Sequence, residues 1–488
     1  MMGIMKTIIK SAAILIACST VASCSLLDVE NTSQIYGSSY WNSPSEVESY
    51  LTGTYTNLRS TMNTLEYFES RSDEFIAGLE GGTSDAWAQN LSSTNGKSWG
   101  PFYTVIQHCN MILKNADKVH FTLSSQKNDI LAQTYVLRSW CYFCLLRLWG
   151  DVPLELEPTE GSNKEKLERS PASEVMEQAI ADTRTAMSLF SSEWGSGKSF
   201  ATLHAAQAMM ADMLLWKIKV LGGDSSLYDD VIDYADLAMQ GTSLEDDFPQ
   251  IFSTRNGKEI IWSIHFSYPE ASGQYSHFLK PRDIFVSKAV NVDEIAYAKS
   301  GARSQYAPSE KMIELLSAYP GDVRKYNSYI VAVDASGNVL GTFDNKMRGT
   351  QTETNYIYDN DIVLYRTAEM ILFKAEALAA KGALDEAVTQ LNLIKSRAKI
   401  ASYSGVKERI SIEQEILAER GREFWLEGKR WPDLVRFHSE GTIDIYQEVP
   451  NLTTKMLNGV YIPLYFAVPV TELDLNHKLT QTVGYENL

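Results

Sequence analysis

Positive charge is scarce in this chain. Over 488 residues, 44 Lys and Arg stand against 61 Asp and Glu, so the formal net charge is −17. An acidic protein is repelled by phosphate backbones, and we therefore expect no nucleic acid among its partners. Histidine is scarce as well: there are seven, and no two of them have the spacing of metal ligands. We expect neither a metal nor a cofactor.

Cysteine is nearly absent, and the motifs of common enzymes are missing. The five cysteines are too few for a fold held together by disulfides. Cys141 and Cys144 lie three residues apart in an apolar helical run, which favours buried thiols. There is no H-E-x-x-H or G-x-S-x-G motif, and the Gly-Lys-Ser at 197–199 lacks the first glycine of a P-loop, because Ser192 stands there. We expect a protein that is not an enzyme.

Long hydrophobic runs are missing too, and the apolar run near the N-terminus is short. Residues 1–23 carry two lysines and no acid, and "AAILIAC" at 12–18 is too short to span a bilayer. These features predict a cleaved signal peptide, with a transmembrane anchor as the weaker alternative. The "VASC" at 21–24 resembles the lipobox of bacterial lipoproteins, so Cys24 is expected to carry a lipid that anchors the mature chain.

Helical periodicity is what the chain has in abundance. Glycines break two helical hairpins, at Gly222-Gly223 and at Gly382, and alanines in both let the paired helices approach closely. This resembles tetratricopeptide-type pairs, with an irregular bundle of hairpins as the alternative. The expected fold is mainly α, built of tetratricopeptide-like helical hairpins. The predicted helices are 44–60, 99–118, 126–149, 172–190, 201–221, 228–240, 309–319, 361–381, 384–399 and 411–430.

The composition changes between about 250 and 360. This segment is rich in Tyr, Gly, Pro and Asn, and strand patterns occur in "EIIWSIHF" (259–266) and "YIVAVDASGNVLGTF" (329–343). The second pattern predicts a hairpin with the turn "DASGN". Loops this long in a compact protein are usually functional. We therefore expect long loops and a few short β-hairpins between the helices.

Aromatic residues suit carbohydrate binding, because their faces stack on sugar rings while neighbouring polar side chains bond the hydroxyls. The chain has 10 Trp and 25 Tyr. Trp87 lies in the polar loop 80–98, where it either covers an edge of the core or contacts a ligand. The expected ligand contacts are Trp87, Asp85, Gln89, Asn90, Tyr275, His277 and Tyr306, with core packing as the alternative for the last three. Five tryptophans in periodic runs are expected in the core: Trp99, Trp140, Trp149, Trp216 and Trp262.

The stretch "LAERGREFWLEGKRWPDLVRF" at 417–437 mixes charged and aromatic residues. Leu417, Phe424 and Trp431 recur at seven-residue spacing, so on one helix they would share a face that packs inward. Arg420 lies near this stripe and would be costly to bury without a carboxylate partner. The pattern indicates an internal scaffold rather than a binding surface.

Ion pairs are expected to hold this stretch together. On a helix, Glu427 would reach Arg430, and Lys429 would reach Asp433. We expect Pro432 to end or kink the helix close to its own position. We further expect Arg420 or Arg430 to pair with one of three acids, Glu423, Glu427 or Glu369.

Several blocks, taken in chain order, resemble one family. They are "CSLLDVEN" (24–31), "SDEF" (72–75), "WGPFYTVIQHCNMIL" (99–113), "LRSWCYFCLLRLWGDVPL" (137–154), "LYRTAEMILFKAEAL" (364–378), "LNLIKSRA" (391–398), the charged stretch 417–437 and "IPLYFAVPVTELDLNHKLTQTVGY" (462–485). With these blocks the chain resembles the SusD/RagB family of outer-membrane nutrient-binding lipoproteins. Departures from the family pattern at 422–425 and 482–483 lie in scaffold blocks.

This resemblance implies a lipid-anchored outer-membrane protein that faces the cell surface, binds oligosaccharide and delivers it to a partner TonB-dependent, SusC-like transporter. Two alternatives stay open: a RagB-like component that binds peptide, and a helical-repeat scaffold lipoprotein without a ligand. A lipid-anchored hydrolase would need a motif that the sequence lacks. The expected organisation is a signal peptide (1–23), an N-terminal region (24–250) with a ligand loop around 76–98, and a C-terminal region (251–488) with a loop and β insert (251–360) before a helical pair and tail (361–488).

Overall fold

A computed structural model describes residues 40–486, apart from 162–164, 269, 271–272, 274, 276, 300, 354, 454–455 and 458. The predicted signal peptide and the predicted lipidation site at Cys24 lie outside these residues. Among the residues described, no helix combines the length and the apolarity that crossing a bilayer requires.

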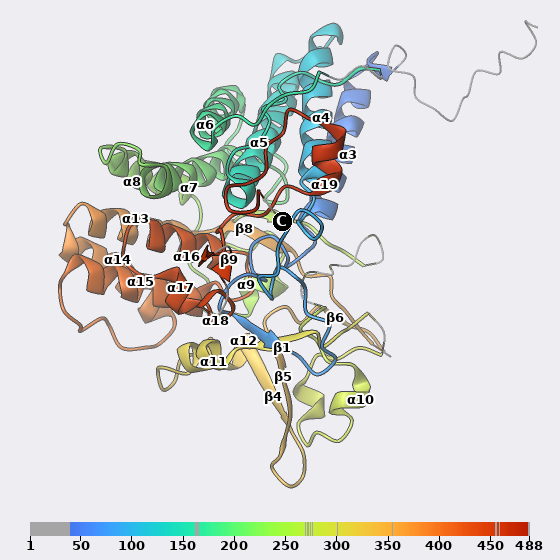
Figure 1. The fold of residues 1–488 in the computed structure, drawn as a ribbon. Coiled ribbons are helices and arrows are strands. Elements are labelled where there is room, and N and C mark those ends of the chain that lie inside the picture. The colour runs from blue at the N-terminus through green and yellow to red at the C-terminus, as the bar shows by residue number, and fades with distance from the viewer. Residues whose placement is uncertain are drawn as a thin grey trace, which may run out of the picture.

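Helices form most of the fold and pack one on the next. The long ones are α3 (Pro44–Met62), α4 (Gly100–Asn115), α5 (Ser124–Trp149), α6 (Ala172–Leu189), α7 (Leu203–Leu221), α8 (Leu227–Ala238), α13 (Thr367–Ala380), α14 (Leu384–Arg397), α15 (Arg409–Glu423) and α16 (Arg430–Ser439). From α5 to α8 each helix contacts its successor, α8 contacts α13, and α13 contacts α14. Figure 1 shows this array running from α3–α6 at the top to α13–α16 below. The expectation of mainly α, tetratricopeptide-like pairs is confirmed.

Glycine closes the first helix of each predicted hairpin. Gly222 caps α7 in the left-handed region with φ 71°, and Gly382 follows α13 with φ 82°. A Cβ at Gly382 would meet nothing within 4 Å, so the backbone conformation, and not crowding, requires glycine here. At the other end of α7, the Thr202 hydroxyl accepts from the Ala205 N–H at 3.1 Å. Local caps thus set where this helix begins and ends.

Short elements fill the segment between α8 and α13 and the C-terminal tail. The helices are α9 (Gln250–Ser253), α10 (Asp283–Val286), α11 (Glu310–Leu316), α12 (Lys325–Ser328), α17 (Ile445–Glu448), α18 (Pro450–Thr453) and α19 (Val470–Leu475), with 3₁₀ turns η1 (Ala116–Lys118) and η2 (Val292–Glu294). The strands form antiparallel pairs: β1 (Phe75–Ala77) with β3 (Tyr306–Pro308), β2 (Ile260–Ile264) with β8 (Ile362–Arg366), β4 (Tyr329–Val333) with β5 (Val339–Asp344), β6 (Thr350–Gln351) with β7 (Tyr356–Ile357), and β9 (Met456–Leu457) with β10 (Val460–Tyr461).

The hairpin predicted at 329–343 is present as β4 and β5. The carboxylate of Asp334 accepts from the N–H groups of Ser336 and Asn338 at 2.8 and 2.9 Å, which closes the turn. The prediction of a helix from 361 is wrong at its start. Residues 362–366 form the fully buried strand β8 against β2, and the helix begins at Thr367. A fully buried strand has a continuous apolar run, which periodicity does not distinguish from a helix.

The charged stretch is not one helix. α15 ends at Glu423, α16 begins at Arg430, and between them Leu426 and Gly428 take positive φ values of 59° and 72°. Pro432 therefore lies in the first turn of α16, where its missing N–H is tolerated, and does not end a helix as predicted. The three residues at seven-residue spacing, Leu417, Phe424 and Trp431, are nevertheless all buried.

The core matches the sequence prediction. All five tryptophans expected there are buried: Trp99, Trp140, Trp149, Trp216 and Trp262. The three described cysteines, Cys109, Cys141 and Cys144, are buried free thiols. Burial raises the pKa of Cys109 and Cys144 to about 12, so these sulfurs stay protonated and inert.

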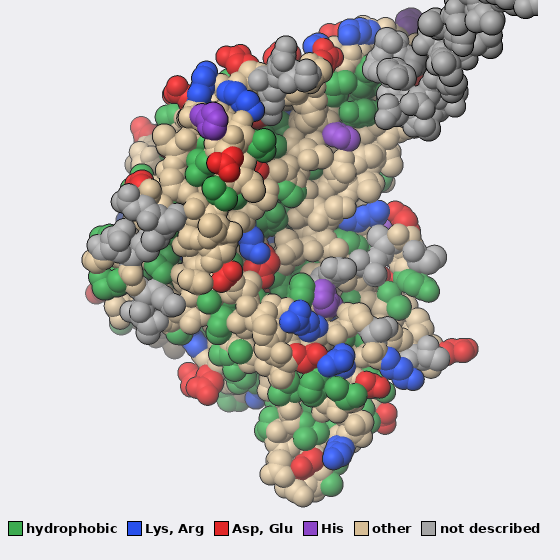
Figure 2. Space-filling view, turned by 45° about the vertical axis from the view of Figure 1, so that its right-hand side comes forward, with side chains coloured by type: hydrophobic (Ala, Val, Ile, Leu, Met, Phe, Trp, Pro, Cys, Tyr) green, Lys and Arg blue, Asp and Glu red, His purple; other side chains and the backbone are tan. Residues whose placement is uncertain are grey.

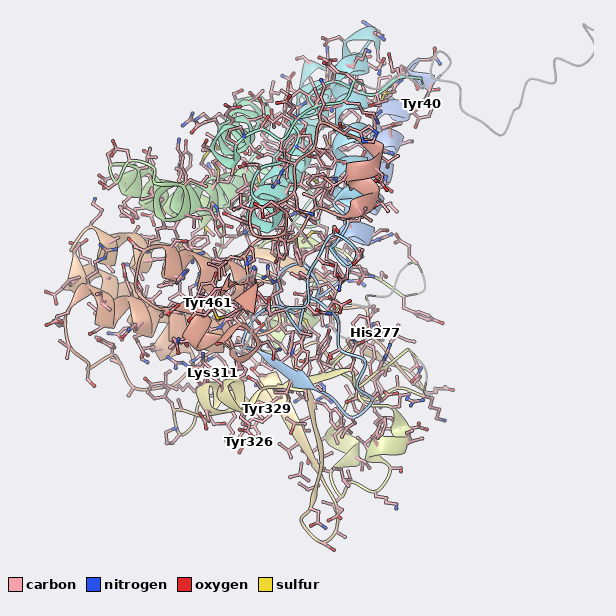
Figure 3. All side chains as sticks on the ribbon, viewed as in Figure 1. Tyr40, His277, Lys311, Tyr326, Tyr329 and Tyr461 are labelled. Carbon is pink, nitrogen blue, oxygen red and sulfur yellow. The ribbon has the colours of Figure 1, made fainter. Side chains whose placement is uncertain are left out.

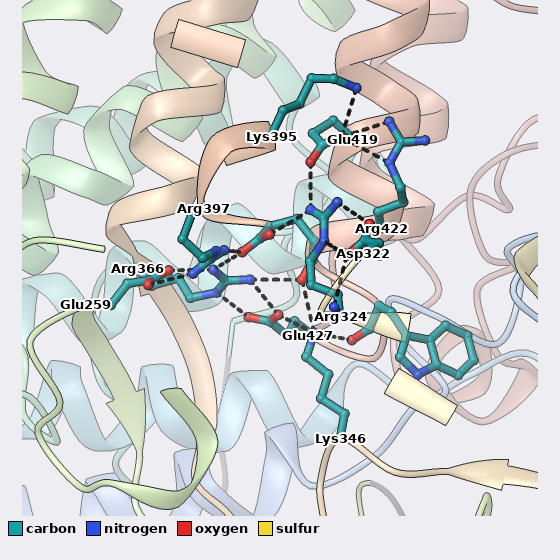
Figure 4. A network of polar contacts seen from close by, with 12 residues as sticks. Glu259, Asp322, Arg324, Lys346, Arg366, Lys395, Arg397, Glu419, Arg422 and Glu427 are labelled. Carbon is teal, nitrogen blue, oxygen red and sulfur yellow. Dashed lines mark hydrogen bonds and ion pairs between the residues drawn. The ribbon is translucent and has the colours of Figure 1, made fainter. Parts of the chain in front are cut away.

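A buried network of ion pairs joins β8, α14 and α15 to charged residues of the 250–360 segment (Figure 4). At its centre Arg366 donates to Glu427 through Nε and Nη2, both at 2.8 Å, and through Nη1 to Glu259 at 2.6 Å. Arg324 reaches Glu419 at 2.6 Å and Glu423 at 2.9 Å. All of these side chains are at most 1% exposed. The charged stretch is internal scaffold, as its pattern indicated.

The predicted pairing of Arg420 with Glu369 is confirmed at 3.1 Å, and Arg420 also meets Asp433 at 2.7 Å. The two predicted pairs within one helix do not form. The positive φ of Gly428 separates Glu427 from Arg430. Lys429 and Asp433 do share a helical turn, in which the Asp433 N–H donates to the Lys429 carbonyl at 3.0 Å, but their side chains pair elsewhere. Instead Glu427 pairs with Arg366 and Lys346, Arg430 with Asp73, and Lys429 with Glu369. Each partner comes from a distant part of the sequence.

Candidate ligand-binding site

The loop predicted to hold the ligand leaves β1 and is fastened to β3. In this strand pair Phe75 lies opposite Pro308, and Ala77 lies opposite Tyr306. The Tyr306 hydroxyl accepts from the Ser84 N–H at 3.0 Å and lies 3.2 Å from Glu66 Oε1, to which it can donate. Tyr306 is distant in sequence and fully buried, and it lies beside the loop that carries Asp85, Trp87, Gln89 and Asn90.

Trp87 is half-buried in this loop and packs against the main core. Its indole N–H donates to the Phe75 carbonyl at 2.9 Å, and its own carbonyl accepts from Asn451 Nδ2 at 2.7 Å. The polar edge of the ring is thus already satisfied by the protein. The part of the Trp87 ring that stays exposed can contact a ligand by stacking, but not through a hydrogen bond.

The polar neighbours of Trp87 divide into two kinds. Asp85 and Asn90 are exposed and bond each other, with Asn90 Nδ2 3.1 Å from Asp85 Oδ1. Gln89 is buried, with φ 53°, and exchanges two hydrogen bonds with Arg71 at 2.9 and 3.0 Å. Arg71 in turn lies over the ring of Trp431 at 4.4 Å. Gln89 therefore holds the loop to the scaffold, while Asp85 and Asn90 face solvent.

The remaining two candidates, Tyr275 and His277, differ in exposure. Tyr275 is buried, and its hydroxyl donates to Glu69 Oε1 at 2.6 Å. His277 is half-buried with its ring 3.8 Å from that of Phe278, and its carbonyl accepts from the Arg303 N–H. Figure 3 shows His277 at the edge of the 250–360 segment, far from Tyr40 and Tyr461. Backbone hydrogen bonds from Gln305 and Tyr306 to Phe278 place His277 near β3.

Three buried carboxyl groups that precede the loop, those of Glu69, Asp73 and Glu74, have shifted pKa values. Burial raises the pKa of Glu69 to about 7, although the Tyr275 hydroxyl and the Gly428 N–H both favour its charged form. Burial and the nearby Glu69 raise the pKa of Glu74 well above its ordinary value. Asp73 shows the opposite behaviour: burial opposes its ionisation, but Arg430 and Lys311 hold its pKa well below the ordinary value. The base of the site therefore holds two carboxyl groups that favour the neutral form beside one that stays ionised.

A polar cleft of about 210 Å³ lies in the 250–360 segment and was not singled out from the sequence. Residues of α9 and the turn after it line one part, and residues 345–350 and 359–361 line another, above Ile260, Ser263 and Val363 of β2 and β8. The sequence signal is a set of Asn- and Gly-containing turns at 254–259, 344–350 and 358–361. Such turns predict that these segments are loops, but they do not predict that the three loops lie together and form a cleft.

Charges of both signs surround this region. Figure 2 shows Lys and Arg side chains interspersed with Asp and Glu over the lower part of the molecule, which carries α10 to α12 and the β4–β5 hairpin. No single-sign field covers this face. Among the residues described, no group of three or more His, Cys, Asp or Glu is placed to hold a metal ion.

Two family models match the chain in order. A model described as "Starch-binding associating with outer membrane" matches residues 25–215, and the SusD family model matches residues 252–485. Two curated relatives agree. "SusD-like protein P38" of Formosa agariphila is 27% identical and aligns over 98% of this chain and 99% of its own length. "Starch-binding protein SusD" of Bacteroides thetaiotaomicron is 28% identical over 217 residues, which are 42% of this chain and 38% of that protein.

Solved structures share the fold. A SusD superfamily protein from Bacteroides fragilis superposes with a TM-score of 0.79 at 23% identity, covering 91% of this chain and 100% of the other. B. fragilis NanU also gives a TM-score of 0.79 at 23% identity, covering 94% of this chain and 100% of the other. At this level of identity the likeness establishes the fold and not the ligand.

Proposed function

Because the chain belongs to the SusD family, we propose that it binds oligosaccharide at the outer membrane and delivers it to a partner TonB-dependent transporter of the SusC-like class. One observation carries the proposal: models of this kind, one of them described as starch-binding and outer-membrane associated, match residues 25–215 and 252–485 in order. Anchoring through a lipid on Cys24 and exposure on the cell surface are parts of the same proposal. Co-purification of a barrel transporter with the full chain, from cells fed on the glycan, tests the delivery step.

The proposed contact surface is the loop after β1. Trp87 would stack its exposed ring area on a sugar, and the exposed Asp85 and Asn90 would bond the hydroxyls. His277, which is half-buried, would border the same surface. Tyr306 is fully buried and bonds Ser84, so it would hold the loop to β3 without touching the ligand. Tyr275 and Gln89 are buried, so in this proposal they support the loop and do not touch the ligand directly.

Replacing Trp87 with alanine is expected to weaken oligosaccharide binding by about tenfold or more, because an aromatic anchor at the centre of a contact surface carries a large share of the binding energy. The same change also removes the indole N–H bond to Phe75 and its packing. It should therefore lower the free energy of unfolding by about 1–3 kcal/mol. Titration calorimetry with the glycan found by an array screen, beside a thermal melt, measures both.

The matched control is Trp87→Phe, which keeps a ring but loses the N–H bond. It should lose stability through that bond and keep most of the binding. If the alanine variant binds with wild-type affinity at a temperature where it is folded, then Trp87 serves the core alone and the ligand surface lies elsewhere.

A further inference from the structure

The polar cleft offers two guanidinium groups that meet no carboxylate in the part of the chain that the structure describes. Among the described residues, neither Arg255 nor Arg348 takes part in an ion pair, although both line the cleft. Arg255 Nη2 donates to the Phe266 carbonyl at 3.2 Å. Arg348 Nη1 donates to the Glu294 carbonyl at 2.9 Å and to Asn345 Oδ1. Arg348 keeps Nε and Nη2, the pair of nitrogens that binds an oxyanion side-on.

The cleft is held in shape before any ligand arrives. Asn360 joins its parts: Nδ2 donates to the Phe252 carbonyl at 2.9 Å, and Oδ1 accepts from the Gly349 N–H at 2.6 Å. Gly349 has φ 73°, and a Cβ there would overlap the Ile357 carbonyl oxygen, so only glycine fits. A preformed cleft loses little conformational entropy on binding, which favours recognition of a small group.

The remaining charged residues of the cleft suit hydroxyl groups. Asp361 accepts from His265 Nδ1 at 2.9 Å and from the Phe266 N–H at 3.0 Å. Asp359 accepts from the Thr350 hydroxyl at 2.9 Å. Carboxylates have further lone pairs for the hydroxyls of a sugar. Lys346 also lines the cleft, but its Nζ donates to the Trp425 carbonyl at 2.6 Å and is buried against Glu427, so it does not add a free positive charge.

We propose that this cleft binds the charged unit of an acidic saccharide. Arg348 and Arg255 would bind its carboxylate or sulfate group, while Asp359, Asp361 and the Asn256 amide bond its hydroxyls. A volume of about 210 Å³ is below the ~300–1,000 Å³ of pockets for drug-sized ligands, so it suits one sugar unit and not a whole oligosaccharide. The inference rests on the proposed function and names the substrate class; the cleft is separate from the loop around Trp87.

The test is titration calorimetry of the full mature chain with four probes: tri-galacturonate, its methyl ester, tri-mannuronate and a sulfated galactose disaccharide. The ester has the same rings without the charge. Wild-type protein should bind at least one acidic probe about tenfold or more tightly than the ester, and salt should reduce this preference. Arg255→Gln and Arg348→Gln should each weaken that binding about tenfold, and the double variant should lose the preference. Arg184→Gln, on the exposed side of α6, should change nothing.

The outcomes separate this inference from the proposed function. If the protein binds saccharides but prefers no acidic probe, or if the double variant keeps the preference while still folded in a thermal melt, the inference is overturned and the proposed function stands. If no saccharide on a broad glycan array binds, both fail. Arginine-dependent binding of an acidic peptide in place of any saccharide also overturns the inference. A preference for the sulfated probe over both uronates, lost in the double variant, supports it and assigns sulfate.

Discussion

Replacing Glu423 with glutamine is expected to lower the free energy of unfolding by about 3–5 kcal/mol, since it breaks a buried ion pair while leaving its partners charged. Glu423 receives three guanidinium groups, those of Arg324, Arg366 and Arg397. Its side chain is fully buried. Glutamine keeps the shape of the side chain but removes its charge. The three buried guanidinium groups would then lack one of the carboxylates that neutralise them. Urea or thermal unfolding of the mature chain measures the loss.

The same substitution should flatten the pH dependence of stability in acid. Burial opposes ionisation of Glu423, but Arg397, Arg366 and Arg324 together hold its pKa well below the ordinary value of 4.5. A carboxyl group with a depressed pKa stabilises the fold above its unfolded-state pKa, and this stabilisation is lost as the pH falls below it. Wild-type stability should therefore decline below about pH 4.5, and the decline should be shallower in the glutamine variant.

Asp385→Asn provides the matched control. Asp385 pairs with Lys407 on the surface, where the two side chains are 81% and 63% exposed. Removing an exposed pair costs about 0–1 kcal/mol. If the two variants are equally stable, the buried network contributes no more than a surface pair, and the view of this stretch as internal scaffold loses its energetic basis.

The order of the helices could be read from the sequence because each long helix carries its own signals. The apolar period, the alanines and the glycines near 222 and 382 are local, and they predicted the hairpins that the structure contains. The strand β8 could not be read in this way. Its residues are buried on both faces, and the strand β2 with which it pairs is about 100 residues away in the sequence.

The ion-pair partners show the same limit. The sequence indicated that Arg420 needs a carboxylate and proposed Glu369, which the structure confirms. For Arg430 and Glu427 it suggested each other, three residues apart, but the partner of Arg430 is Asp73. Helical spacing brings two side chains together only where the helix is continuous, and the positive φ of Gly428 between Glu427 and Arg430 removes that geometry. Spacing predicts that charges need partners more reliably than it predicts which ones.

The sequence identifies candidate site residues by the chemistry of their side chains, but that chemistry does not determine whether a side chain is exposed. Tyr306 and the loop around Trp87 were selected separately, and the structure brings them together through Ser84. Gln89 has the amide expected of a sugar contact, but its positive φ and its bonds to Arg71 turn it inward. The polar cleft has no local sequence signal, because its arginines lie in separate loops that only the folded chain brings together.

Replacing Glu69 with glutamine is expected to remove a loss of stability that the wild-type protein suffers as the pH rises. The pKa of Glu69 is raised from 4.5 to about 7 by burial, so the folded state keeps a proton that the unfolded state has already released. Its stabilising neutral form is fully present below pH 4.5 and is lost as the pH rises through 7. At about 1.4 kcal/mol for each pKa unit, wild-type stability should fall by about 3 kcal/mol relative to the variant between pH 4.5 and 8.

The geometry around Glu69 explains why glutamine should fit. Tyr275 and the Gly428 N–H both donate to Oε1, while no hydrogen-bond partner within the described structure meets Oε2. The amide oxygen can occupy the first position and the NH₂ group the second, where the neutral acid would carry its proton. Burial raises the pKa of Glu69 most and the charge of Glu427 raises it further, while Lys346 lowers it, so the balance raises the pKa of this carboxyl group.

Chemical denaturation of wild-type and Glu69→Gln protein across pH 4.5 to 8 measures the difference, with Glu314→Gln on the exposed side of α11 as the control. The control should follow the wild-type curve. Parallel curves for wild type and Glu69→Gln would mean that Glu69 is ionised in the folded protein throughout this range. In the expected case, the Tyr275 hydroxyl bonds a neutral acid below pH 7, and the fold loses stability as that acid ionises while the pH rises through 7.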